Sequence, residues 1–225
     1  MFEIVFPKEK SDVPRDDLYL IFQTMRMTNL VKMLFYAALD IQQYAPKSMI
    51  TARKTEELFL AHGANLYEVL HRMQDAEYGK SLHDRYKDKL RDRQTLSVLD
   101  GLMDLVKSDD RSIRVLEAIR NKHSAHIATD NFYIWNNISE KPNDRDIPVG
   151  VGESNKHGDW FFTLDSGLLF AHIGTTILRD SKNVRHDVIT IIKEYSVRLI
   201  DLFVRIGKEL LIPLFEALEI DEAQE

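Results

Sequence analysis

The sequence contains no cysteine, and this absence excludes disulfide bonds, thiolate metal sites and a cysteine nucleophile. Glycine and proline are scarce, with 9 and 6 among 225 residues, so the chain has few of the turn signals that a fold of many short strands needs. The opening segment MFEIVFPKEK lacks the long apolar run of a signal peptide, and no segment is apolar enough to span a membrane. We therefore expect a cytoplasmic protein that has no membrane partner.

An excess of basic charge is also missing. The net charge is −6, from 30 Lys and Arg against 36 Asp and Glu, whereas a protein that coats nucleic acid is usually basic. Any contact with nucleic acid must therefore be local. One basic stretch, residues 80–93, holds six Lys and Arg against three Asp, and this alternation favours a solvated helix face over a binding site.

Apolar residues make up 44% of the chain, enough for a sizeable core, and they recur at helical spacing. The pattern predicts long helices over 18–45, 51–76, 82–107, 111–128 and 183–219. Pro46 ends the first helix, Gly79 lies in a turn after the second, and Pro213 is expected to kink or break the last. Neither a repeat nor a linker divides the chain. The prediction is an all-α bundle of about five helices that forms a single domain over residues 1–225.

A polar segment over 129–159 interrupts the helical pattern, and 135–159 is expected to be the most irregular part of the fold. Its aromatic flanks, 132–135 and 160–164, either pair as a short β-hairpin or lie on the helices. The run VGVGE at 149–153 lacks the Lys-Ser/Thr of a phosphate-binding loop, so we interpret it as an ordinary loop.

The last predicted helix carries apolar residues on two sides. Beside a long stripe from Val184 to Leu210, there is a second stripe that comprises Val197, Ile200, Val204 and Leu211. Either this second side is a subunit interface, or the N-terminal helices cover it within one chain. The sequence leaves both alternatives open.

The run Arg-Asn-Lys-His-Ser-Ala-His at 120–126 is the most informative part of the sequence. At about 100° per residue, the buried stripe of the predicted helix comprises Ile113, Leu116, Ile119, Arg120, His123 and Ile127. The opposite face comprises Arg114, Glu117 and Asn121. Since burying an arginine alone is costly, an anion, a ligand or a second subunit must lie beside Arg120.

Histidines at such positions are more often packed core residues than ligands, and for His123 and His62 this is the favoured interpretation. His123 and His126, three residues apart, could touch one metal ion. No further ligands occur at a recognisable spacing, however, and the sequence has no HExxH pattern. We therefore expect no metal and no other cofactor.

Arg120, Asn121 and His126, on a helix of an all-α chain that ends in a long amphipathic helix, resemble the motif of HEPN domains. That motif has an arginine, a polar residue, three to five further residues and then a histidine. The run RNKHSAH, followed by Asp130, is most similar to the abortive-infection branch of the family. The resemblance covers about 20 residues and the helical architecture, and it implies a HEPN-like bundle.

The resemblance implies a metal-independent endoribonuclease that acts as a homodimer, with the motif helices of both copies lining one cleft. It implies a role in phage defence or in a toxin–antitoxin system with a possible antitoxin partner. His126 would act as general base or general acid, and Arg120 would stabilise charge on the phosphate of the RNA. Asn121 would hold the histidine or the partner helix, and His123 would support the site.

Two neighbouring residues of the run, Lys122 and Ser124, are candidates for contacting the RNA substrate. The chain departs from one branch of the family. Toxins paired with nucleotidyltransferase antitoxins resemble Arg…His-x-Tyr, in which the tyrosine is modified, whereas Ala128 occupies that position here. This departure puts that mode of neutralisation in doubt.

Two other functions compete with the nuclease. The alternative function is a non-catalytic HEPN-like module that binds nucleotides or partner proteins, and the acidic composition is compatible with it. A third interpretation is a purely structural helical dimer in which Arg120 meets a carboxylate. The joint presence of Arg120, Asn121 and His126 favours the nuclease over this third interpretation.

Overall fold

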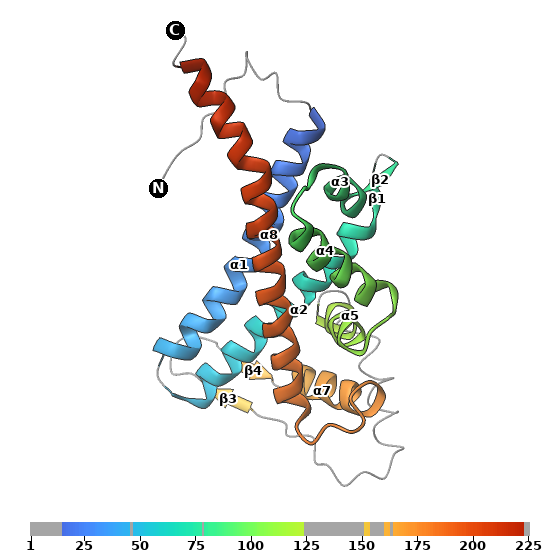
Figure 1. Ribbon diagram of the computed structural model, residues 1–225. Helices are drawn as coiled ribbons and strands as arrows, with labels where there is room; N and C mark the ends of the chain where they lie inside the picture. Colours follow the sequence, from blue (N-terminus) through green and yellow to red (C-terminus); the bar gives the residue numbers. More distant parts are fainter. Residues whose placement is uncertain are drawn as a thin grey trace.

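The computed structural model describes residues 15–45, 47–77, 79–123, 151–153, 160–162 and 164–222. The helices in these ranges are α1 (Arg15–Tyr44), α2 (Met49–Gln74), α3 (Leu82–Lys89), α4 (Arg93–Lys107), α5 (Arg111–His123), α7 (Leu164–Thr176) and α8 (Val184–Glu222) (Figure 1). Two antiparallel pairs of short strands complete the described part, β1 (Ala76–Glu77) with β2 (Lys80–Ser81) and β3 (Val151–Glu153) with β4 (Trp160–Phe162). The predicted all-α class is confirmed, with seven helices in the described ranges in place of about five.

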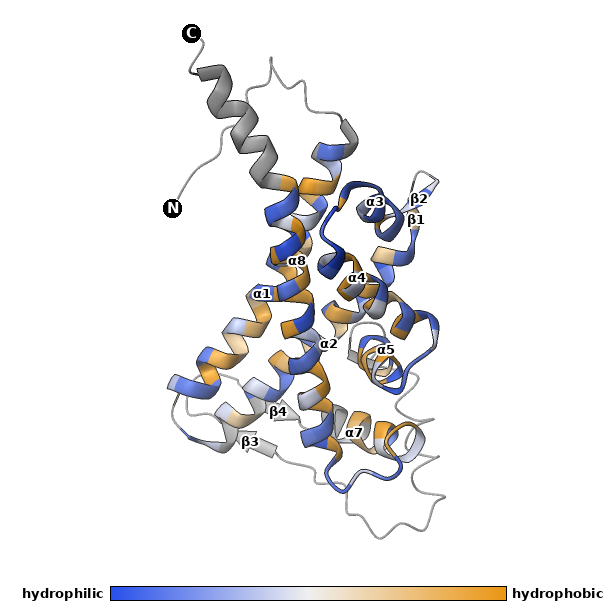
Figure 2. Cartoon of the chain, viewed as in Figure 1, coloured by the Kyte–Doolittle hydropathy of each residue, from blue (hydrophilic) through white to orange (hydrophobic). Residues whose placement is uncertain are grey.

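Helix α2 is the centre of the bundle. It packs against α1 and α8 on one side and against α5 on the other, while α8 runs along the molecule and also touches α4 and α7 (Figure 1). The apolar stripes of the helices meet in one core, and Figure 2 shows hydrophobic and hydrophilic residues alternating along α1, α2 and α8. The bulkiest fully buried side chains are Tyr86, Phe59 and Phe203. Burying an aromatic or leucine side chain contributes about 1.5–3 kcal/mol, so this shared core holds the helices together.

The prediction of one helix over 82–107 was wrong, because the chain forms α3 and α4 with a break at 90–92. Asp92 caps α4 by accepting hydrogen bonds from the backbone N–H groups of Gln94 and Thr95. The carboxylate of Glu209 on α8 accepts from the backbone N–H groups of Arg91 and Asp92, at 2.9 and 3.2 Å. These acceptors satisfy N–H groups that a continuous helix would have bonded internally, so the break is stabilised.

The predicted turn around Gly79 is confirmed. It joins β1 to β2, and Gly79 has a φ of 84°, a left-handed conformation that residues with a Cβ atom rarely adopt. Pro213 does not break the last helix, since α8 continues to Glu222. None of the described helices combines the length and the apolar content that crossing a lipid bilayer requires.

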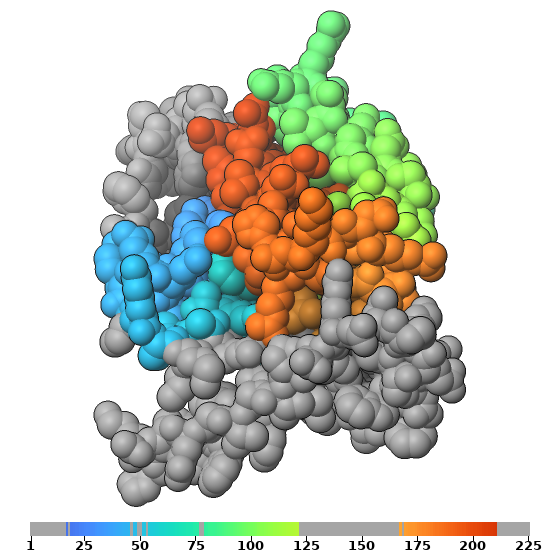
Figure 3. Space-filling view, turned by 90° about the horizontal axis from the view of Figure 1, so that it is seen from below, coloured from blue at the N-terminus to red at the C-terminus, as the bar shows by residue number. Residues whose placement is uncertain are grey.

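The polar segment was predicted only in part. Trp160–Phe162 is a strand as one alternative allowed, but its partner is Val151–Glu153, inside the run that we interpreted as a loop. The other suggested strand, 132–135, lies outside the described residues. Helix α7 was not predicted at all. It packs against α5 and α8, and Figure 3 shows this orange region beside the yellow-green of α5.

The two sides of α8 differ in burial. The long stripe is in the core, with Val188, Ile192 and Leu199 fully buried. On the second side Ile200 and Val204 are half-buried within the chain, whereas Val197 is 59% exposed. The described part of the chain therefore covers this side only partly.

Candidate functional site on helices α2 and α5

Helix α5 presents the beginning of the motif to α2. Ile113, Leu116 and Ile119 are buried as predicted, and Asn121 is exposed on the opposite face. Arg120 is at the edge between the two faces, with 41% of its side chain exposed. The predicted stripe is therefore confirmed for these three apolar residues, while Ile127 lies outside the described residues. Arg120 is half-buried rather than turned into the core.

The partner that Arg120 was predicted to need is Glu68, on α2 of the same chain. Arg120 Nε donates to Glu68 Oε1 at 2.6 Å, and Arg120 Nη1 donates to Asn121 Oδ1 at 3.1 Å. The hydrogen bond and the negative charge of Glu68 raise the pKa of Arg120 above its ordinary value, so the guanidinium stays charged. The carboxylate and the amide together fix the direction of the guanidinium plane.

Tyr67 and Glu117 form a second polar pair beside Glu68 and Arg120. Tyr67 directly precedes Glu68 on α2, and Glu117 lies three residues before Arg120 on α5. Tyr67 on α2 lies near Glu117 on α5, and burial followed by the negative charge of Glu117 raises the pKa of the tyrosine. The Tyr67 ring also packs against the ring of His71, at 5.9 Å between centroids. His71 Nδ1 in turn lies 3.3 Å from Asp75 Oδ2. The surface around Arg120 thus carries a tyrosine, a histidine and carboxylates within one stretch of α2.

The rest of the predicted site is not described in full. Lys122 and His123 belong to the last turn of α5, but their side chains lie outside the described part of the chain. Ser124 and His126 lie in the range 124–150, which is outside the described residues altogether. The structure therefore places Arg120 and Asn121 together and says nothing of the predicted catalytic histidine.

His62 is a packed core residue, as predicted. Its side chain is fully buried between α2 and α8, with its ring stacked against Phe35. Ser196 Oγ donates to the carbonyl of Ile192 at 2.6 Å, so His62 Nε2 donates to Ser196 Oγ, at 2.7 Å. Burial lowers the pKa of His62 to about 4. This serine–histidine pair is out of reach of a substrate, and its function is structural.

The basic stretch at 80–93 is balanced by acidic partners, which supports the solvated-face interpretation. Lys80 pairs with Asp88 at 2.6 Å, and Lys89 pairs with Asp17 of α1 at the same distance. Lys87 and His83 both contact Asp100. In the part of the chain that the structure describes, His, Asp and Glu side chains are nowhere grouped in threes as metal ligands would be.

Sequence reasoning missed Glu68 and Tyr67. Glu68 is 52 residues from Arg120, and only the packing of α2 against α5 brings them together. A weak signal was present, since any half-buried arginine needs an anion and α2 has few acidic residues near its apolar stripe. Nothing in the spacing, however, identifies which helix faces the motif.

Comparison with known proteins adds no family assignment. No protein-family model matches the sequence, and no curated protein or solved structure is significantly similar to it.

Proposed function

We propose that the protein is a metal-independent endoribonuclease of the HEPN type, with Arg120 as its phosphate-binding residue. The observation that carries this proposal is the placement of Arg120. It is half-exposed, its direction is fixed by Glu68 and Asn121, and it begins the run that ends at His126. A permanently charged guanidinium with a fixed plane is suited to a phosphate group.

The ion pair with Glu68 is compatible with phosphate binding. A guanidinium has five N–H donors, and the bonds to Glu68 and Asn121 use two of them. Further donors can therefore serve a phosphate while Glu68 keeps the side chain oriented. The negative charge of Glu68 also weakens binding of any polyanion, which limits affinity for RNA in the absence of further contacts.

The chemistry requires two proton transfers. The 2′-oxygen of the ribose attacks phosphorus, the bond from phosphorus to the 5′-oxygen breaks, and a 2′,3′-cyclic phosphate forms. A base takes the proton of the 2′-hydroxyl, and an acid gives a proton to the leaving 5′-oxygen. Histidine titrates near neutral pH and can perform either transfer, so a homodimer with His126 of both copies in one cleft supplies both groups.

The biological setting follows from the resemblance of the run RNKHSAH to the abortive-infection branch. We assign the activity to the cytoplasm, in phage defence or a toxin–antitoxin system, with an antitoxin protein as a possible partner. The HEPN-like architecture, the homodimer and the roles of Asn121, His123, Lys122 and Ser124 belong to the same proposal.

The second candidate is a non-catalytic module that binds nucleotides or proteins. The Arg120–Glu68 pair favours it, because an arginine that a carboxylate already compensates needs no substrate to stabilise it. The same pair is equally what a purely structural role would require.

One experiment separates these functions. Purified protein is incubated with single-stranded RNA in the presence of EDTA, and the ends of the products are analysed. Cleavage that leaves a 2′,3′-cyclic phosphate, or the 3′-phosphate derived from it, supports the nuclease. A substrate with deoxyribose at the cut position should be inert, because it has no nucleophile. Binding without cleavage would support the second candidate, and neither binding nor cleavage would support the structural role.

A further inference from the structure

The solvent-facing side of α1 carries a stripe of large apolar residues. Its exposed large residues are Phe22, Met25, Met33, Tyr36 and Tyr44, which are between 43% and 75% exposed. These positions follow one another at spacings that keep them on one stripe of the helix. The opposite side of α1 is buried against α2 and α8 through residues such as Val31 and Ala38. A helix that already buries one side normally has a polar outer side, so this stripe is unusual.

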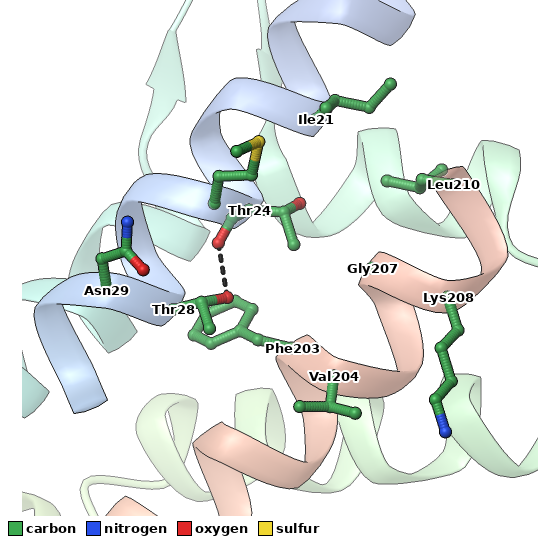
Figure 4. Close-up of a pocket in the computed structure, with 10 residues that line it drawn as sticks. Ile21, Thr24, Thr28, Asn29, Phe203, Val204, Gly207, Lys208 and Leu210 are labelled. Carbon is green, nitrogen blue, oxygen red and sulfur yellow. Dashed lines mark hydrogen bonds between the residues drawn. The ribbon is translucent and has the colours of Figure 1, made fainter. Parts of the chain in front are cut away.

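A groove continues the apolar stripe onto α8. It has a volume of about 410 Å³ and is lined by Ile21, Thr24, Met25, Thr28, Asn29, Phe203, Val204, Gly207, Lys208 and Leu210. Figure 4 shows Ile21 of α1 and Leu210 of α8 extending into the space between the two helices. Met25 belongs to both the stripe and the groove. Val197, two turns before Val204 on α8, is 59% exposed.

Two opposite charges lie on the same exposed side of α1. Arg26 is seven residues before Met33 and Asp40 is seven residues after it, so each is about 10 Å from Met33 along the axis. Within the described ranges neither residue forms an ion pair, and they are too far apart to pair with each other. The arrangement is symmetric about Met33, with an apolar centre and opposite charges at equal distances from it.

We propose that α1 is an interface at which two copies of this chain pack antiparallel, with the twofold axis close to Met33. A twofold interface requires that if one residue contacts a second across it, the second contacts the first. With the axis at Met33, Arg26 meets Asp40 of the second copy and Phe22 meets Tyr44 of the second copy. The two Met33 side chains meet on the axis. Both charges are then compensated, and the apolar stripe is removed from water.

The symmetry of the pattern identifies the occupant as a second copy. An unrelated partner helix would need an apolar stripe and complementary charges, but no such partner would require the two charges of α1 to be equidistant from Met33. The pairing is also independent of RNA cleavage, because α2 lies between α1 and α5, the helix that carries Arg120 (Figure 1). A joint cleft at the motif helices would be a separate contact.

The test exchanges the charges at Arg26 and Asp40 and measures the mass of the assembly by light scattering at micromolar concentration. Wild-type protein should have two or four times the 26.2 kDa chain mass. Arg26→Asp places two carboxylates opposite each other, and Asp40→Arg places two cations opposite each other, so each single change should halve the mass. The double variant Arg26→Asp/Asp40→Arg restores the pairing with reversed charges and should recover the wild-type mass.

Met33→Glu tests the centre of the interface and should also halve the mass. Ser97→Glu, an exposed change on α4, is the control and should not. Circular dichroism confirms that each variant is folded, and RNA cleavage assays show separately whether the nuclease proposal holds. A monomeric wild-type protein would overturn the proposal. A double variant whose mass stays halved would overturn it too, because the antiparallel pairing requires recovery.

Discussion

The guanidinium of Arg120 donates from Nε to Oε1 of Glu68 at 2.6 Å, and this bond joins the first residue of the motif to α2. Both side chains are close to half exposed, at 41% and 43%, so the pair is within reach of solvent and of a ligand. The anion that the sequence required beside Arg120 is therefore supplied by the same chain. A second subunit is not needed to stabilise this arginine, and a phosphate must bind in the presence of the Glu68 charge.

Glu68→Gln should strengthen RNA binding at low salt by about three- to tenfold, because Arg120 regains its full attraction for phosphate. Glutamine retains a carbonyl oxygen that can accept from Arg120 Nε, so the side chain should keep its direction. The affinity is measured by fluorescence anisotropy at two salt concentrations, and the gain should shrink at the higher one. Glu194→Gln, the same charge change at an exposed position of α8, is the matched control. Equal effects of the two substitutions would show that Arg120 does not contact RNA.

The sequence predicted the helices correctly where apolar residues recur regularly at helical spacing. The helices α1, α2, α5 and α8 all begin within three residues of the predicted starts. The segment of α7 was missed because its sequence, LDSGLLFAHIGTT, contains glycines and threonines, which are poor helix formers. Its contacts with α5 and α8 stabilise it as a helix in the folded chain.

The errors at α3 and α4, and in the candidate site, have a common physical cause. The break at 90–92 depends on Glu209, which is 117 residues from Asp92, and the partner of Arg120 depends on Glu68, 52 residues away. Helical periodicity reports which side of a segment is buried, not which segment buries it. Glu68 and Glu209 could therefore be identified only after the helices had been placed against one another.

Acidification should destabilise the protein through His62. Its pKa is about 4 in the folded chain against about 6.5 when unfolded, so the unfolded state binds the proton more tightly. The contribution of neutral His62 to the free energy of unfolding is fully present above pH 6.5. It decreases as the pH falls from 6.5 to about 4 and is lost below that pH. The loss amounts to about 3 kcal/mol. Urea unfolding at a series of pH values from neutral down to the folded-state pKa of about 4 measures it.

Two variants isolate this effect. His62→Gln can still donate to Ser196 but does not titrate, so its stability should change less with pH than that of the wild type. Ser196→Ala removes the hydroxyl and leaves the imidazole buried. It should lower the stability at every pH while keeping the pH dependence, since burial is the cause of the shift. If His62→Gln had the wild-type pH dependence, a different group would be responsible.

Replacing two helical glycines by alanine should change the stability of the protein in opposite directions. A Cβ atom on Gly63 would lie 3.1 Å from Cδ1 of Ile192 and 3.3 Å from Cδ1 of Ile119, so Gly63→Ala should crowd α2 against α8 and α5. Such overpacking costs roughly 1–3 kcal/mol. Gly101 lies on the exposed side of α4, where an added Cβ atom would meet no neighbouring element within 4 Å. Gly101→Ala should therefore stabilise the protein by about 0.5–1 kcal/mol. Thermal unfolding of the two variants measures both changes in stability. If Gly63→Ala were stabilising, α2 could move away from α5 and α8 at no cost in free energy.

In the proposed mechanism, His126 transfers a proton and Arg120 stabilises charge on the phosphate. His126→Ala removes a proton-transfer group and should lower the rate of RNA cleavage by about 10²–10⁴-fold. Arg120→Ala should lower it by a similar factor, because the negative charge of the transition state is no longer compensated. Single-turnover cleavage in EDTA measures both rates, with circular dichroism to confirm that the variants are folded.

His123→Ala is the internal comparison for that experiment, because His123 and His126 are three residues apart on the same run. As a packing residue, His123 should contribute roughly 1–3 kcal/mol to stability and nothing to the proton transfer, so the folded fraction of His123→Ala should cleave at nearly the wild-type rate. A large loss of rate in His123→Ala with normal activity in His126→Ala would exchange the two roles. Full activity in Arg120→Ala and His126→Ala alike would show that the active site is elsewhere, since the proposed mechanism cannot proceed without both groups.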